Sequence, residues 1–160
     1  MKRSAIVVAC LLSLSALVTV PSVMAQADKL IGVWKVTEVK YPQMDYVDAQ
    51  TITDPQPRLY IFTNKHYSQM EVTGDKPRAD LPEEPTDEQI AAAYWQFRAN
   101  SGTYEVKGST ITFLPIVAKG PNVTNSPRPF SADYKFEGDS LITLFETSFG
   151  LIELKLTRLE

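Results

Sequence analysis

Hydrophobic and polar residues alternate along most of the chain after residue 30, which is typical of β-strands with one buried face. The alternation predicts eight strands, over residues 32–39, 58–62, 66–72, 102–106, 109–118, 129–136, 140–147 and 151–159. Short turn sequences that contain Gly or Asn join most of these segments. Consecutive hairpins without long crossovers predict an antiparallel up-and-down meander, and its closure into an eight-stranded β-barrel would remove exposed strand edges.

One segment near the middle of the chain has a helical period instead. Residues 86–99 begin with Thr86, and Gln89 three positions later completes a capping-box pattern. Apolar side chains then recur at helical spacing, at Ile90, Tyr94 and Phe97. We therefore predict an all-β fold with one inserted α-helix over residues 86–99. We expect this helix, with the Pro-rich segment before it, to cover one mouth of the barrel or to pack on its wall.

Residues 1–25 have the pattern of a secretory signal peptide. Two basic residues precede an apolar run over 5–20, and small residues lead to Ala25. We predict cleavage after Ala25, with cleavage after Ala27 as the second option. The domain would then span residues 26–160, in a secreted or periplasmic protein without an integral membrane segment after cleavage.

Charge and cysteine content exclude several classes of function. Cys10 is the one cysteine and lies within the predicted signal peptide, so the secreted domain has no disulfide, cysteine nucleophile or thiolate metal site. Without Lys2 and Arg3 the domain carries 14 basic and 19 acidic residues, a net charge of −5. We therefore expect neither nucleic acid nor an anionic membrane surface as a partner. With His66 as the one histidine, we expect no metal and no cofactor, and the sequence leaves the oligomeric state open.

In a small barrel, inward side chains both fill the core and line any ligand cavity. Glu38 alternates in phase with Trp34, so an inward Trp34 would bring this carboxylate inside, unless Glu38 lies at a wet barrel mouth. His66 would face the cavity together with Ser68, or would lie exposed at the end of its hairpin. The candidate ligand-binding residues are Glu38, Tyr60, Phe62, His66, Tyr67, Ser68, Met70, Tyr104, Phe113 and Tyr134.

Gly32 and Trp34 stand at the start of the first predicted strand, and Arg158 stands near the end of the last. This arrangement of Gly-x-Trp and Arg resembles that of the lipocalin/calycin superfamily. The segments LIGVWKV (30–36) and FRANSGTYEVKGSTIT (97–112) further resemble bacterial secreted proteins that carry a lipocalin-like domain. The resemblance implies a closed barrel in which the Arg158 guanidinium lies over the Trp34 indole and Gly32 allows a tight turn.

Three functions remain open from the sequence. The first, which we favour, is binding of a small lipophilic molecule inside the barrel, with apolar wall residues supplying the affinity. The second is a structural or interaction module that acts through its surface and whose barrel is filled by side chains. The third is an enzyme with Glu38 or His66 as acid or base, but no pair of catalytic residues is evident, so we assign no catalytic residue.

Overall fold

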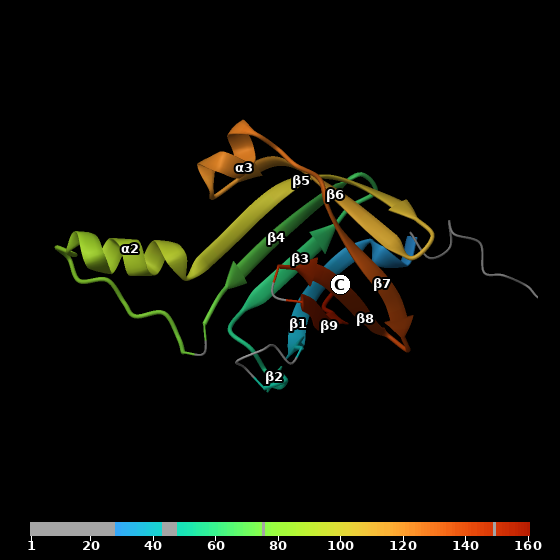
Figure 1. Cartoon of the computed structure of the whole chain (residues 1–160), viewed down its shortest axis with the longest axis horizontal. Coiled ribbons are helices and arrows are strands. Elements are labelled where there is room, and N and C mark those ends of the chain that lie inside the picture. Colours follow the sequence, from blue (N-terminus) through green and yellow to red (C-terminus); the bar gives the residue numbers. More distant parts are fainter. Residues whose placement is uncertain (1–27, 43–47, 75, 149) are drawn as a thin grey trace, which may run out of the picture.

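The computed structural model describes residues 28–42, 48–74, 76–148 and 150–160, and the predicted signal peptide with both cleavage positions lies outside this part of the chain. Strands dominate the described residues (Figure 1). The elements are β1 (Gly32–Tyr41), β2 (Gln50–Thr53), β3 (Arg58–Phe62), β4 (His66–Val72), α2 (Asp87–Trp95), β5 (Phe97–Lys107), β6 (Thr110–Ala118), α3 (Pro121–Asn125), β7 (Phe130–Glu137), β8 (Ser140–Thr147) and β9 (Gly150–Arg158).

The strands form one closed antiparallel barrel. From β3 onward each strand pairs with the next in sequence, and β1 pairs with β9 to close the wall. Both β2 and β3 pair with β1, β2 along residues 38–41 and β3 along residues 32–35, so they act as two halves of one strand. The prediction of an eight-stranded up-and-down barrel is therefore confirmed, with the second strand split in two.

A short break separates β2 from β3. Pro55 and Pro57 lack the N–H groups that a strand ladder needs, and Asp54 has a φ of 53°. The Asp54 N–H donates a hydrogen bond to Thr37 O over 3.0 Å, which holds the break against β1. The break therefore lies beside the residue at which β1 itself becomes irregular.

A β-bulge in β1 changes which of its side chains face the core. β9 pairs with the residues on either side of Thr37, so Thr37 is the extra residue. Val39 is consequently fully buried, whereas Glu38 faces outward, with its carboxylate 3.4 Å from Lys40 Nζ. The prediction that Glu38 shares the inward face of Trp34 is wrong, because one extra residue reverses the alternation.

The base of the barrel is built around Trp34, which is 1% exposed. Its Nε1–H donates to Leu30 O at 2.8 Å, and Arg158 Cζ lies 4.2 Å from the centroid of the indole. The Arg158 guanidinium also donates to the carbonyl oxygens of Lys29 and Ile31. One cation–π contact and these hydrogen bonds therefore tie the last strand to the residues that precede the first.

Aromatic side chains fill the middle of the barrel. The Phe113 ring centroid lies 4.8 Å from that of Tyr67, 4.9 Å from that of Phe130 and 6.2 Å from that of Phe62. Edge-on and stacked contacts of this kind are favourable beyond the area they bury. The interior from the base to this layer is therefore occupied by side chains, and a larger cavity lies toward the other end.

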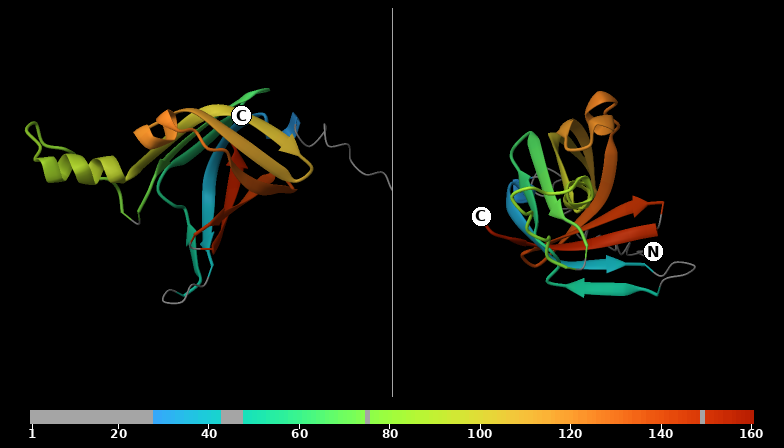
Figure 2. Two further views of the ribbon diagram at one scale, coloured as in Figure 1. Left: turned by 45° about the horizontal axis from the view of Figure 1, so that its top comes forward. Right: turned by 90° about the vertical axis from the view of Figure 1, so that its left-hand side faces the viewer.

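Helix α2 is shorter than predicted and projects away from the barrel (Figure 1 and Figure 2). Its capping box is present, since the Gln89 N–H donates to Thr86 Oγ1 over 3.3 Å and the Thr86 N–H donates to Gln89 Oε1 over 2.9 Å. The helix ends at Trp95 because residues 97–101 pair with β4 instead. None of its nine described residues is buried, so the expectation that it covers a mouth or packs on the wall is wrong.

A second helix, α3, lies between the predicted strands 109–118 and 129–136, in a segment for which the sequence predicts neither strand nor helix. Pro121 stands in its first turn, where the missing N–H costs nothing. The Ala118 N–H donates to Thr124 Oγ1 over 3.0 Å, which fastens α3 to the end of β6. Within the described residues, no helix has the length and hydropathy needed to cross a bilayer.

Candidate functional site

The end of the barrel opposite Trp34 contains a cavity of about 600 Å³, here called the mouth cavity. Its two sides differ in chemistry. On one side, strands β3, β4 and β5 contribute Arg58, Tyr60, Gln69, Glu71, Arg98 and Asn100. On the other side, strands β7, β8 and β9 contribute Phe130, Phe145, Ile152 and Leu154. The cavity therefore suits a molecule that is itself polar on one part and apolar on the rest.

The strand register arranges the polar side into rows. In the row nearest the mouth, Arg58 pairs with Glu71, and Glu71 pairs with Arg98 on the next strand. The second row is Tyr60, Gln69 and Asn100, and the third is Phe62, Tyr67 and Gly102. Polarity therefore decreases from the mouth toward the filled part of the barrel.

Three polar atoms of the first two rows are buried without a hydrogen-bond partner among the described residues. Arg58 is 8% exposed and Gln69 is 5% exposed. Asn100 Nδ2–H donates to Gln69 Oε1 over 3.3 Å, but Arg58 Nε, Gln69 Nε2 and Asn100 Oδ1 have no hydrogen-bond partner among the described residues. Leaving such an atom unpaired costs about 1–3 kcal/mol, so a bound molecule that pairs with these atoms recovers part of that cost.

The side chains of Tyr60 and Glu71 are hydrogen-bonded to each other. The Tyr60 hydroxyl donates to Glu71 Oε1. Burial raises the pKa of Tyr60 well above its ordinary value, and the charge on Glu71 and this hydrogen bond raise it further, against the opposing charges of Arg58 and Arg98. Tyr60 therefore keeps its proton at neutral pH and acts as a hydrogen-bond donor, not as a base.

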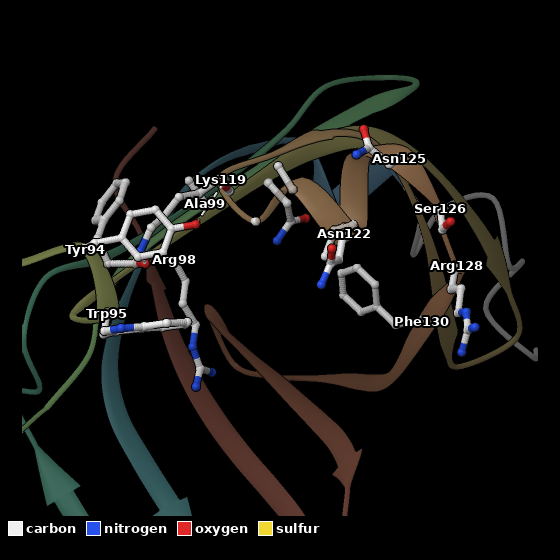
Figure 3. A pocket seen from close by; sticks show the side chains of 15 residues that line it. Tyr94, Trp95, Arg98, Ala99, Lys119, Asn122, Asn125, Ser126, Arg128 and Phe130 are labelled. Atoms are coloured by element: carbon white, nitrogen blue, oxygen red, sulfur yellow. Dashed lines mark hydrogen bonds between the residues drawn. The ribbon is translucent and has the colours of Figure 1, made fainter. Parts of the chain in front are cut away.

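A second hollow, of about 770 Å³, lies beneath α3 beside β5 and β6, and we call it the α3 groove. Figure 3 shows Tyr94 and Trp95 on one side of the groove and Phe130 on the other. The groove and the mouth cavity share the lining residues Arg98, Asn100 and Phe130. The two spaces are therefore adjacent, and together they lead from the barrel interior to the end of α2.

The sequence-predicted ligand-binding residues do not form one cluster. Tyr60 lines the mouth cavity. The filled part of the barrel contains Phe62, Tyr67, Tyr104, Phe113 and Tyr134. His66 is exposed at the start of β4, and the half-buried Ser68 and Met70 alternate with the buried Tyr67 and Gln69. The inward face of β4 is therefore the opposite of the one that would carry His66 and Ser68 into a cavity.

The positions of Glu38 and His66 decide whether either residue could act as an acid or a base at a cavity. The Glu38 carboxylate lies beside Lys40 on the outer surface, and His66 is exposed. Neither residue is among those that line the mouth cavity or the α3 groove. A general base must reach the proton that it removes, so the geometry gives the enzyme hypothesis no support at these two residues.

Sequence reasoning missed Arg58, Gln69, Glu71, Arg98 and Asn100 as site residues. Arg58 stands two residues before Tyr60, and the alternation therefore already places both on one face. Gln69 and Glu71 likewise share a face with Tyr67, but alternation alone does not decide which face of this strand points inward. The helix predicted over residues 86–99 includes Arg98 and ends beside Asn100, so the sequence pattern places neither residue on a strand.

Buried tyrosines make the stability of the fold sensitive to alkaline pH. Burial raises the pKa of Tyr67 to about 12, and it also raises the pKa of Tyr104 and of Tyr134. The unfolded chain releases these phenol protons above about pH 10 while the folded state retains them, so we expect the free energy of unfolding to fall between about pH 10 and pH 12. Urea unfolding at about pH 8 and pH 11 measures the change.

The control for this prediction is Tyr67→Phe. The Tyr67 hydroxyl is buried without a hydrogen-bond partner among the described residues, so its removal is expected to leave the protein folded at neutral pH. The variant should lose less stability than the wild type between the two pH values. An unchanged urea midpoint in the wild type would contradict the prediction.

Comparisons with known proteins add little to this picture. No protein-family model matches the chain, and a search of curated proteins finds no match. A crystal structure of an uncharacterized protein from Bacteroides eggerthii DSM 20697, at 2.60 Å resolution, is similar with a TM-score of 0.42 and 10% sequence identity, over 81% of this chain and 98% of that chain. Among the described residues, no group of three or more His, Cys, Asp or Glu side chains could hold a metal ion.

Proposed function

We propose that this protein is a lipocalin-like, secreted or periplasmic binder of a small, mainly apolar molecule, which it holds in the mouth cavity. The observation that carries the proposal is the contrast within this cavity. An apolar side built from Phe130, Phe145 and Ile152 faces a polar side on which buried atoms of Arg58 and Gln69 have no hydrogen-bond partner among the described residues. Small-molecule sites typically combine apolar lining with a few fixed polar groups, and volumes of about 300–1,000 Å³ are usual for them.

The filled part of the barrel supports the same proposal. Aromatic packing around Phe113 occupies the interior next to the base, so a ligand is confined to the mouth. The mouth cavity then ends on a floor of packed aromatic rings, and its apolar side supplies most of the affinity. Native mass spectrometry of the protein purified from its own host tests the proposal directly, since a bound lipophile adds its mass to that of the chain.

Filling the mouth cavity with a larger side chain should weaken binding. We expect Ile152→Trp to weaken binding of the neutral dye N-phenyl-1-naphthylamine about tenfold or more, because the larger ring occupies the mouth cavity. Leu151→Trp is the matched control, since Leu151 is 48% exposed and points outward from the same strand. Dye-fluorescence titration measures both variants, and equal loss in both would speak against binding in the cavity.

A second candidate function is that of a module acting through its surface. Leu114, Ile116 and Val117 are 46%, 60% and 54% exposed along β6, and runs of exposed apolar side chains often mark interaction sites. If the native protein carries no small molecule and the dye does not bind, this apolar strip becomes the better-supported basis for function.

A further inference from the structure

The unpaired atoms of the mouth cavity specify the polar end of a ligand. The Arg58 Nε–H is a donor without a partner among the described residues. The side-chain amides of Gln69 and Asn100 share one hydrogen bond, which leaves one amide N–H donor and one amide oxygen acceptor unpaired among the described residues, whichever way the two amides are turned. Arg58 and Gln69 are diagonal neighbours on adjacent strands, within reach of one another's long side chains. A group with two acceptor oxygens would satisfy the Arg58 donor and the free amide donor together.

The charges in the row nearest the mouth select the sign of that group. Arg58 and Arg98 pair with Glu71 from the two neighbouring strands, so this row carries two guanidinium groups and one carboxylate. One oxygen of Glu71 already accepts a hydrogen bond from Tyr60. The polar side therefore has an excess of positive charge, and charge-assisted hydrogen bonds from a buried arginine favour a carboxylate over a neutral or cationic group.

The fold also indicates where the rest of the ligand lies. The floor of the cavity is filled, so a long chain cannot continue toward the base. Strands β6 and β7 pair only over residues 110–113 and 130–133 of the described chain, and β6 runs on to Ala118 with β5 as its partner. Phe130 stands where the two strands separate and lines both the mouth cavity and the α3 groove. A chain that leaves the cavity beside Phe130 enters this groove.

The far end of the groove is aromatic. Tyr94 and Trp95 pack edge to face with ring centroids 5.3 Å apart, and the Lys119 Nζ lies 3.6 Å from the Tyr94 centroid (Figure 3). This contact holds the Tyr94 ring beside Lys119, which directly follows β6, whereas Trp95 remains 74% exposed. Burial of such an exposed indole under a hydrocarbon chain would be favourable, because it removes apolar surface of both from water.

We propose that the ligand is an elongated monocarboxylate amphiphile. Its carboxylate accepts hydrogen bonds from Arg58 and Gln69 in the mouth cavity, and its hydrocarbon chain passes Phe130 and lies in the α3 groove beside Trp95. The inference rests on the proposed binding function and deepens it by naming the chemical class and the path of the ligand.

The test of the carboxylate compares three probes with the same chain length, dodecanoate, 1-dodecanol and dodecylammonium, by displacement of N-phenyl-1-naphthylamine. Dodecanoate is expected to displace the dye at a concentration about tenfold lower than 1-dodecanol does, and dodecylammonium should be the weakest. Arg58→Gln is expected to reduce the difference between dodecanoate and 1-dodecanol to about threefold or less. Lys107→Gln, which removes an exposed cation at the end of β5, should leave the difference unchanged. Urea unfolding establishes that each variant is folded.

The test of the chain path uses Trp95 as a reporter. Trp34 is already buried, so a shift of tryptophan emission to shorter wavelength on binding reports the covering of Trp95. Dodecanoate is expected to produce this shift, whereas hexanoate, whose chain is too short to leave the mouth cavity, should bind without it. Trp95→Phe should remove the shift and leave the preference for the carboxylate.

The outcomes separate this inference from the proposed function. Equal affinity for dodecanoate and 1-dodecanol, or a preference that Arg58→Gln leaves intact, overturns the carboxylate assignment while binding in the cavity stands. Carboxylate-dependent binding without a shift of Trp95 emission overturns the path through the groove. Absence of binding by the dye and by all three probes rejects the proposed function itself.

Discussion

Replacing Trp34 with alanine is expected to lower the free energy of unfolding by about 3–5 kcal/mol. The indole is 1% exposed, so its removal leaves a void at the base of the barrel. The same change takes the hydrogen-bond donor from Leu30 O and the ring from beneath the Arg158 guanidinium. Urea unfolding should be followed by far-UV circular dichroism, because the substitution itself changes the tryptophan fluorescence.

Arg158 variants separate the contributions at the base. Arg158→Ala should cost about 1–3 kcal/mol, since the guanidinium donates to the carbonyl oxygens of Lys29, Ile31 and Glu160 and covers the Trp34 ring. Arg158→Lys keeps a cation there but loses the forked hydrogen bonds, so it should fall between alanine and the wild type. Both variants should bind the dye as the wild type does. Wild-type stability combined with lost dye binding would show that the base belongs to the binding site.

Gly102→Ala is expected to lower the free energy of unfolding by about 2–3 kcal/mol, although the added group is a single methyl. A Cβ at position 102 would contact Leu114 O and would lie 2.8 Å from Pro115 Cα and 2.9 Å from Ile116 N. All three are backbone atoms of β6, which cannot rotate away as the end of a flexible side chain can. The cause is the bulge between β5 and β6, where the pairing skips one residue next to Gly102 and brings the two backbones together.

Gly120→Ala is the matched control. Gly120 precedes α3 with an ordinary φ of −77°, and the nearest atom to a Cβ there is Val123 Cγ2 at 3.9 Å. This variant should differ from the wild type by less than about 0.5 kcal/mol in urea unfolding. Equal effects of the two substitutions would mean that the close approach of β5 and β6 relaxes at little cost.

Local sequence was sufficient where one strand face met the core without interruption. In β3, β7 and the second half of β9, buried and exposed residues alternate in the way that the sequence pattern predicts. The capping box at Thr86 was also readable, because its two hydrogen bonds join residues three positions apart. The end of α2 is not evident from local sequence, because residues 97–101 join the sheet by pairing with β4.

The candidate site depended on choices that local pattern leaves open. An alternating segment such as β4 has two faces, and the partner strands decide that Gln69 and Glu71, not His66 and Ser68, point inward. In β1 the inward face changes at Thr37, because β9 and the broken second strand impose a bulge there, and Glu38 is thereby moved outside.

The sequence by itself determined an all-β chain with short antiparallel connections, since alternation and turn chemistry are properties of neighbouring residues. Only the tertiary structure decided which faces are inside and where the barrel is hollow. The register brings Arg58, Gln69 and Asn100 from three strands into one polar side, and the early separation of β6 from β7 opens the mouth cavity toward the α3 groove. Both depend on pairing between residues distant in the sequence, which no local pattern encodes.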